Sequence, residues 1–148
     1  MPSIVPSYVY TLFASIIVGT LIITMCGLAV ASIKSDAEEQ KLSSIVEYVA
    51  AEGIKLAAHA PADNLTVTVS LDVPALIGNQ RYWLQIQSDS AETWVEAGFG
   101  AVIISSEQRA QIPAVSTASG FYLSGSGAVY LTGYSDTRGF HLTLHGGN

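Results

Sequence analysis

Charged residues are scarce in this chain, and the scarcity is concentrated at one end. Only 12% of the 148 residues are Asp, Glu, Lys or Arg, which is about half the share typical of soluble domains. No charged residue and no histidine precedes Lys34. Because a helix needs roughly 20 apolar residues to cross a bilayer, the sequence predicts a long hydrophobic helix at the N-terminus.

The first ten residues, MPSIVPSYVY, also lack any basic side chain. A secretory signal peptide has a basic start, a short apolar core and a small-residue cleavage site. The apolar run here has no basic start and is too long for such a core. We therefore expect a helix that is retained in the mature protein.

Basic residues are few throughout: the chain has six Lys and Arg, and its net charge is −6. Nucleic-acid binding requires a basic surface, so this balance argues against a nucleic-acid partner. The single cysteine, Cys26, excludes an intramolecular disulfide. Because Met25 precedes it, where a lipidation site would have a small residue, we interpret Cys26 as a small hydrophobic side chain.

Nothing in the sequence prevents one continuous helix over residues 7–59. Pro2 and Pro6 fit at or before a first helical turn, and the next proline is Pro61. At 1.5 Å per residue, such a helix is about 80 Å long. We call residues 7–33 the apolar segment and residues 34–60 the amphipathic segment.

The amphipathic segment has hydrophobic residues at helical spacing, with most of its charges off that stripe. This pattern predicts that one side of the helix packs against the rest of the protein while the other faces water. The stripe contains Leu42, Ile45, Val46, Val49, Gly53, Ile54 and Ala57.

Residues 62–148, which we call the head, have strand-like patterning. Short runs such as NLTVTVSL, RYWLQIQ, ETWVEAG, AVIIS and GFHLTLH are separated by Gly, Ser and Asp, and GFYLSGSGAVYLTGY reads as two strands about a Ser-Gly turn. We expect an α+β protein whose head is a small antiparallel β-sandwich or barrel, with SEQRAQIPAVSTAS as a loop around Pro113. The expected core residues are Val67, Val69, Leu71, Tyr82, Leu84, Ile86, Trp94, Val102, Ile104, Tyr122, Val129, Leu131, Phe140, Leu142 and Leu144.

Side chains suited to catalysis or metal binding are sparse and poorly spaced. His141 and His145 would lie about 13 Å apart on a strand, too far to share a metal ion. The glycines around Ser124 and Ser126 fall at the wrong offsets for a nucleophile elbow, and GFGAVI lacks the third glycine of a dinucleotide fingerprint. We expect neither an enzyme nor a cofactor or metal site.

One modification motif stands between the helix and the first strand. Asn64, Leu65 and Thr66 form an N-glycosylation sequon. Asn64 is therefore a candidate for N-glycosylation.

A long helix, apolar and then amphipathic, followed by a β-rich head resembles the plan of archaeal type IV pilins and archaellins. Residues 71–86, LDVPALIGNQRYWLQI, also resemble a stretch of the form P-x-x-I-G-x-x-x-Y-x-I that links two strands in many archaeal pilin-like sequences. Family precursors carry a short basic leader before the apolar helix. This sequence begins without such a leader. That is expected of a mature chain and equally of a chain that is not processed. The positions that match or nearly match the stretch are Pro74, Ile77, Gly78, Tyr82, Leu84 and Ile86.

The resemblance implies a structural subunit of an extracellular filament at the cell surface that serves attachment or cell–cell contact. The apolar segment would hold the subunit in membrane lipid, and an assembly ATPase with a platform protein would extract it. Helices of many copies would then bundle into a homopolymer with the heads outside. The residues expected in that filament core are Ile16, Gly19, Ile22, Ile23, Cys26, Gly27 and Val30.

The same layout also fits a second class of protein. A membrane-anchored accessory protein, similar to an archaellum stator component, would keep the helix in lipid and bind the surface layer through its β-domain. Such a protein would not polymerise. The sequence leaves this alternative open.

Overall fold

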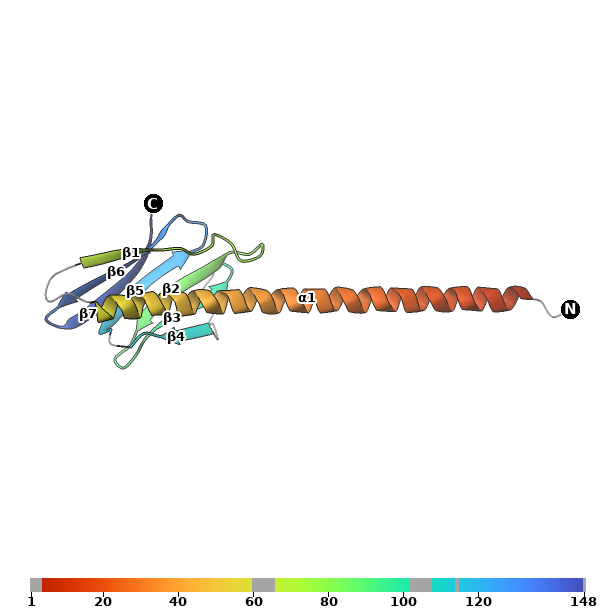
Figure 1. Cartoon of the computed structure of the whole chain (residues 1–148), viewed down its shortest axis with the longest axis horizontal. Coiled ribbons are helices and arrows are strands. Elements are labelled where there is room, and N and C mark those ends of the chain that lie inside the picture. Colours follow the sequence, from red (N-terminus) through yellow and green to blue (C-terminus); the bar gives the residue numbers. More distant parts are fainter. Residues whose placement is uncertain (1–3, 60–65, 102–107, 114, 148) are drawn as a thin grey trace. The chain divides into compact units, whose positions relative to one another are not determined.

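A computed structural model describes residues 4–59, 66–101, 108–113 and 115–147. The long N-terminal helix and the α+β class expected from the sequence are confirmed (Figure 1). Helix α1 spans Ile4–Ala58. The strands are β1 (Thr66–Leu71), β2 (Tyr82–Ser88), β3 (Thr93–Phe99), β4 (Gln108–Gln111), β5 (Thr117–Leu123), β6 (Val129–Asp136) and β7 (Gly139–Gly146).

Two compact units divide the chain, Met1–Ala37 and Glu38–Asn148. We call the second the sheet unit. The sequence led us to divide the chain at residues 61 and 62, where the helix gives way to strands. The compact unit begins earlier, because the C-terminal part of α1 belongs to it.

The described strands form one seven-stranded sheet in the order β1-β6-β7-β5-β2-β3-β4. All neighbours are antiparallel except β5 and β7, which are parallel. The expected sandwich or barrel is therefore wrong: these strands make a single layer. The C-terminal part of α1 lies across one face of the sheet (Figure 1) and occupies the place of a second sheet, since a sheet needs only one partner layer to bury its apolar face.

The core lies between that part of α1 and the sheet. Leu42, Val46 and Val49 are at most 2% exposed, and they belong to one hydrophobic cluster with residues of every strand except β4. Of the expected core residues, Val67 and Val69 are partly buried, and Val102 and Ile104 lie outside the described residues. Those that are buried as expected are Leu71, Tyr82, Leu84, Ile86, Tyr122, Val129, Leu131, Phe140, Leu142 and Leu144.

The expectation that Trp94 lies in the core is wrong. Val95 and Ala97 are buried in the core, whereas Trp94 is only partly buried. Successive side chains of a strand point to opposite faces, so Trp94 lies on the face away from α1. There the Arg109 guanidinium stacks 3.9 Å from the centre of the Trp94 ring.

The expected loop around Pro113 is also partly wrong. Strand β4 occupies its first part and pairs with β3 at the edge of the sheet. Arg109 and Gln111 of β4 both donate to Glu92 Oε2, at 3.3 and 2.9 Å. No strand was expected here, because this edge strand is held by polar cross-strand contacts and has little apolar alternation.

Residues 71–86 form the end of β1, a compact turn and the start of β2. Ile77 and Gln80 exchange two backbone hydrogen bonds of 3.1 and 3.0 Å, and the Tyr82 hydroxyl donates to the Pro74 carbonyl at 2.5 Å. A Cβ at Gly78 would lie 2.0 Å from Glu38 Oε1. Burial raises the pKa of Tyr82. This stretch is thus a fixed turn packed against the helix residues at the start of the sheet unit.

Candidate functional site

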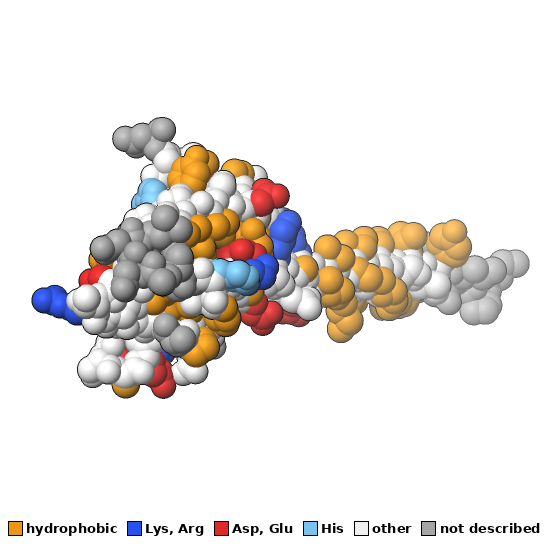
Figure 2. Space-filling model, turned by 60° about the vertical axis from the view of Figure 1, so that its left-hand side comes forward, with side chains coloured by type: hydrophobic (Ala, Val, Ile, Leu, Met, Phe, Trp, Pro, Cys, Tyr) orange, Lys and Arg blue, Asp and Glu red, His pale blue; other side chains and the backbone are white. Residues whose placement is uncertain are grey.

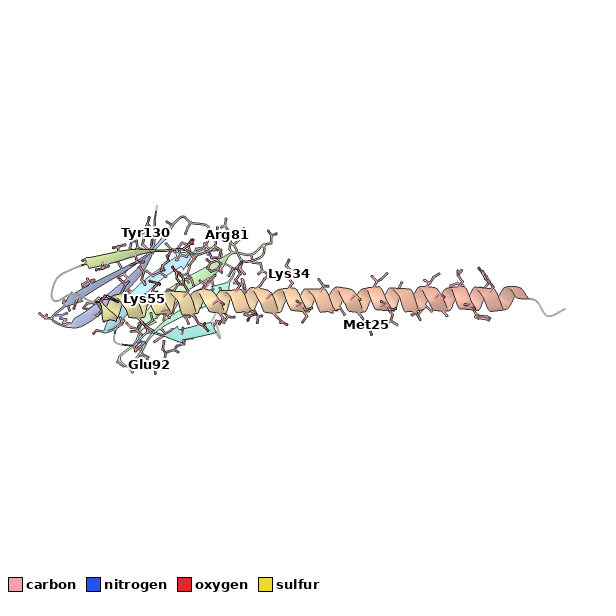
Figure 3. The ribbon with its side chains drawn as sticks, in the orientation of Figure 1. Met25, Lys34, Lys55, Arg81, Glu92 and Tyr130 are labelled. Atoms are coloured by element: carbon pink, nitrogen blue, oxygen red, sulfur yellow. The ribbon has the colours of Figure 1, made fainter. Side chains whose placement is uncertain are left out.

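The apolar segment is the most unusual surface of the described chain. All of its described side chains from Tyr8 to Ile33 are exposed, apart from Gly19, which is partly exposed. Figure 2 shows hydrophobic side chains along this helix and no charged ones, and Met25 projects away from the helix in Figure 3. A helix that is hydrophobic on all sides requires an apolar environment on all sides.

The residues expected in a filament core all lie on this surface. Ile16 is 55% exposed, Ile22 56%, Ile23 73% and Val30 67%. Cys26 and Gly27 are exposed as well. In the described chain these side chains have no tertiary partner that buries them, so the surface is available to lipid or to another helix.

Three hydroxyl groups of the apolar segment are satisfied inside the helix itself. Ser15 Oγ donates to the Thr11 carbonyl at 2.9 Å, and Thr24 Oγ1 donates to the Thr20 carbonyl at 2.8 Å. Thr20 Oγ1 lies 3.0 Å from the Ile16 carbonyl oxygen, to which it donates. A hydroxyl bonded to the carbonyl one turn earlier needs no water, so these residues do not oppose transfer to a dry environment.

Small residues leave open space along one side of the segment. A shallow groove is lined by Thr11, Ala14, Ser15, Val18, Gly19 and Ile22. A Cβ added at Gly19 or Gly27 would meet no atom within 4 Å. Small side chains let neighbouring helices approach closely, which is compatible with helix packing at this place.

By length and composition, α1 is able to cross a membrane. Tyr8 and Tyr10 stand at one end of the apolar segment and are 76% and 75% exposed. Lys34 stands at the other end. Aromatic and basic residues at the two ends are typical of a helix that spans a bilayer.

The amphipathic segment is placed differently. Leu42, Ile45, Val46 and Val49 are buried in the core of the sheet unit. Ile54 is 40% exposed, so its assignment to the contact between helix and head is wrong. At about 100° per residue, Ile54 lies about 140° around the helix from Val49. Gly53 and Leu56 occupy the packed side at this level.

His141 belongs to a polar network on the sheet face away from α1. Its Nε2 lies 2.9 Å from Asp136 Oδ1, and its Nδ1 is hydrogen-bonded to the Thr117 hydroxyl. The ring also stacks on Tyr134 with centroids 4.6 Å apart. The hydrogen bond from His141, with one from the Arg138 backbone, lowers the pKa of Asp136.

The other side chains considered for chemistry have structural partners. Ser124 is 1% exposed, and its hydroxyl oxygen accepts a hydrogen bond from the Tyr82 backbone at 2.9 Å. Ser126 Oγ donates to the Leu123 carbonyl at 2.5 Å. Within the described residues, no three His, Cys, Asp or Glu side chains are grouped to hold a metal ion. Asn64, the glycosylation candidate, lies outside the described residues.

No protein-family model, curated protein or solved structure matches this chain. The apolar segment was found from composition alone. The ordered polar face around His141 was missed, because it arises from strands distant in sequence.

Proposed function

We propose that the chain is the structural subunit of an extracellular filament resembling a type IV pilus. It would be stored in the membrane by its apolar segment and polymerised through helix bundling. The observation that carries the proposal is the helix α1 itself, Ile4–Ala58, which continues from an apolar segment into a packed amphipathic one without a break.

The hydrophobic effect favours an environment without water around the apolar segment. Fully burying one large aliphatic side chain contributes about 1.5–3 kcal/mol. The segment exposes many such side chains, among them Leu12 at 54% and Leu28 at 69%. Lipid satisfies that requirement before assembly. After extraction, only neighbouring apolar helices offer an equally dry site.

The continuous helix favours a polymer over a simple anchor. An anchor needs roughly 20 apolar residues and a connection of any kind. Here the helix runs directly into residues packed on the sheet, such as Leu42 and Val46. A filament with outward-facing heads needs such a direct connection between its core helix and each head.

The proposed service is surface attachment or cell–cell contact, with the assembly ATPase and platform protein as separate partners. Both proposals rest on the resemblance to archaeal pilins. The runner-up is a membrane-anchored accessory protein that does not polymerise and binds the surface layer.

Fractionation of cells that carry the chain separates the two proposals. Filaments sheared from the surface and analysed by mass spectrometry are expected to contain this chain as a major component. Recovery of the chain only from membranes, at low copy number, would refute the filament and favour the anchored accessory protein.

A further inference from the structure

The sheet face away from α1 carries a row of hydroxyl side chains that crosses four strands. The strand register aligns Thr68 of β1 with Thr132 of β6, Thr132 with Thr143 of β7, and Thr143 with Ser119 of β5. Paired residues on neighbouring strands share a face, at steps of about 4.8 Å. We call Thr68, Thr132, Thr143 and Ser119 the hydroxyl row.

Two aromatic pairs lie on either side of the hydroxyl row. Tyr130 stacks on His145 with ring centroids 5.8 Å apart and an interplanar angle of 27°. Tyr134 stacks on His141 at 4.6 Å and 17°. Both tyrosines come from β6, and Thr132 lies midway between them; Tyr130 is labelled in Figure 3.

The Tyr134–His141 pair is held in place before any ligand binds. Asp136 and Thr117 hydrogen-bond the two ring nitrogens of His141, and His141 in turn supports the Tyr134 ring. Side chains that are already ordered lose little entropy on binding. This aromatic pair is thus preorganised.

Several hydroxyls on this face have no hydrogen-bond partner within the described residues. Thr68 Oγ1 and Thr132 Oγ1 bond each other at 3.0 Å. No side-chain hydrogen bond is formed there by Thr143, Ser119, Tyr130 or Tyr134. A hydroxyl both donates and accepts, so this row offers donors and acceptors together.

The hydroxyl row carries no charged side chain, although the chain as a whole carries −6. Asp136, the nearest carboxylate of this network, is engaged by His141. A neutral ligand would therefore desolvate no unpaired charge, which would otherwise be costly. A charged ligand would find no opposite charge in the row.

From these features we propose that this face binds a neutral polysaccharide. Sugar hydroxyls match the mixed donors and acceptors of the hydroxyl row, and the tyrosine rings provide apolar area with a polar tip for the carbon faces of the sugar rings. A protein partner fits this face less well, because the core of a protein interface favours larger apolar and aromatic groups than this threonine row presents. The inference holds for a filament subunit and for an anchored protein alike.

The test uses the full chain in a detergent without a sugar headgroup, so that the detergent does not compete. Dextran, mannan and xylan are the neutral probes, and heparin and polygalacturonate are the anionic ones. Retention by affinity electrophoresis is compared for the unchanged chain, the double variant Tyr130→Ala and Tyr134→Ala, the variant Thr143→Val, and Tyr48→Ala. Tyr48 is the matched control, because it is 37% exposed, close to the 41% of Tyr134, and lies on α1.

We expect retention by at least one neutral probe, about tenfold weaker for the double variant, weaker for Thr143→Val and unchanged for Tyr48→Ala. Circular dichroism confirms that each variant is folded. The proposal is overturned if no neutral probe retains the chain, if anionic probes are preferred, or if the folded double variant binds equally well. It is also overturned if the double variant instead abolishes self-association, since the face would then bind a second copy.

Discussion

The two halves of α1 share one secondary structure and have opposite surroundings. In the C-terminal half, Leu42 and Val49 are 2% and 0% exposed, whereas in the apolar segment Ile23 and Leu28 are 73% and 69% exposed. The C-terminal half buries one stripe against its own sheet. The apolar segment has apolar groups on all sides, and no single layer covers them. Its partner must surround it, as lipid or a bundle of helices does.

The largest effect is expected from a charge in the apolar segment. Ile22→Asp should abolish filament formation, because an unpaired buried carboxylate costs several kcal/mol in a helix core. Ala51→Asp is the control, since Ala51 is exposed on the half of α1 that packs on the sheet. Electron microscopy of surface filaments measures the outcome, and normal filament yield from Ile22→Asp would refute the placement of this residue in the core.

Truncating a side chain should lower the free energy of unfolding in the packed half of α1 and not in the apolar segment. Leu42→Ala is expected to lower the free energy of unfolding of the sheet unit by about 2–5 kcal/mol, through lost burial and a new cavity. Leu28→Ala, in the apolar segment, should leave that free energy unchanged. Denaturant titration of the full chain in detergent, followed by tryptophan fluorescence, measures both. Equal losses from the two variants would show that the halves are not independent.

Adding a side chain at a glycine should also affect stability differently in the two halves of α1. A Cβ at Gly53 would lie 3.1 Å from Ile112 Cδ1 and 3.2 Å from Leu142 Cδ2, whereas Gly27 has open space. Gly53→Leu should therefore destabilise the sheet unit by about 1–3 kcal/mol through overpacking, and Gly27→Leu should not. Thermal melting by circular dichroism tests this, and an unchanged melting temperature for Gly53→Leu would contradict the close packing of α1 on the sheet.

Acid should weaken the sheet unit slightly and leave the apolar segment unaffected. Hydrogen bonds from the Ala91 and Glu92 backbone lower the pKa of Asp89, and the bond from His141 lowers that of Asp136. A lowered folded pKa gives a stabilisation that is present above the ordinary value near 3.9 and is lost as pH falls through the folded value. The apolar segment has no carboxylate or histidine.

Unfolding titrations of the sheet unit within the full chain, between about pH 2 and pH 6, measure this dependence. Replacing both residues, Asp89→Asn and Asp136→Asn, should flatten it. An unchanged slope would show that these two carboxylates do not carry the effect.

The sequence predicts the parts of this fold that depend on local patterns. The charge-free run before Lys34 and the helical spacing of Leu42, Val46 and Val49 predict the helix and its buried side. Period-two alternation predicts most of the strands. The number of sheet layers does not follow, because alternation identifies an apolar face without indicating whether a helix or a sheet covers it.

Errors at single residues have a similar origin. Trp94 was expected in the core, but the phase of β3 puts Val95 inside. Ile54 was assigned to the packed stripe although it lies around the helix from it. The hydroxyl row was not predicted, because it depends on the cross-strand register between Thr132 and Thr143 and their distant neighbours.

The central claim is that copies of the apolar segment pack against one another. Electron cryomicroscopy of filaments sheared from the cell surface tests it most directly. The account predicts a central bundle built from residues 8–33 of many copies, with the sheet units outside. It would be contradicted if the chain is found only as separate copies in the membrane, with those residues surrounded by lipid.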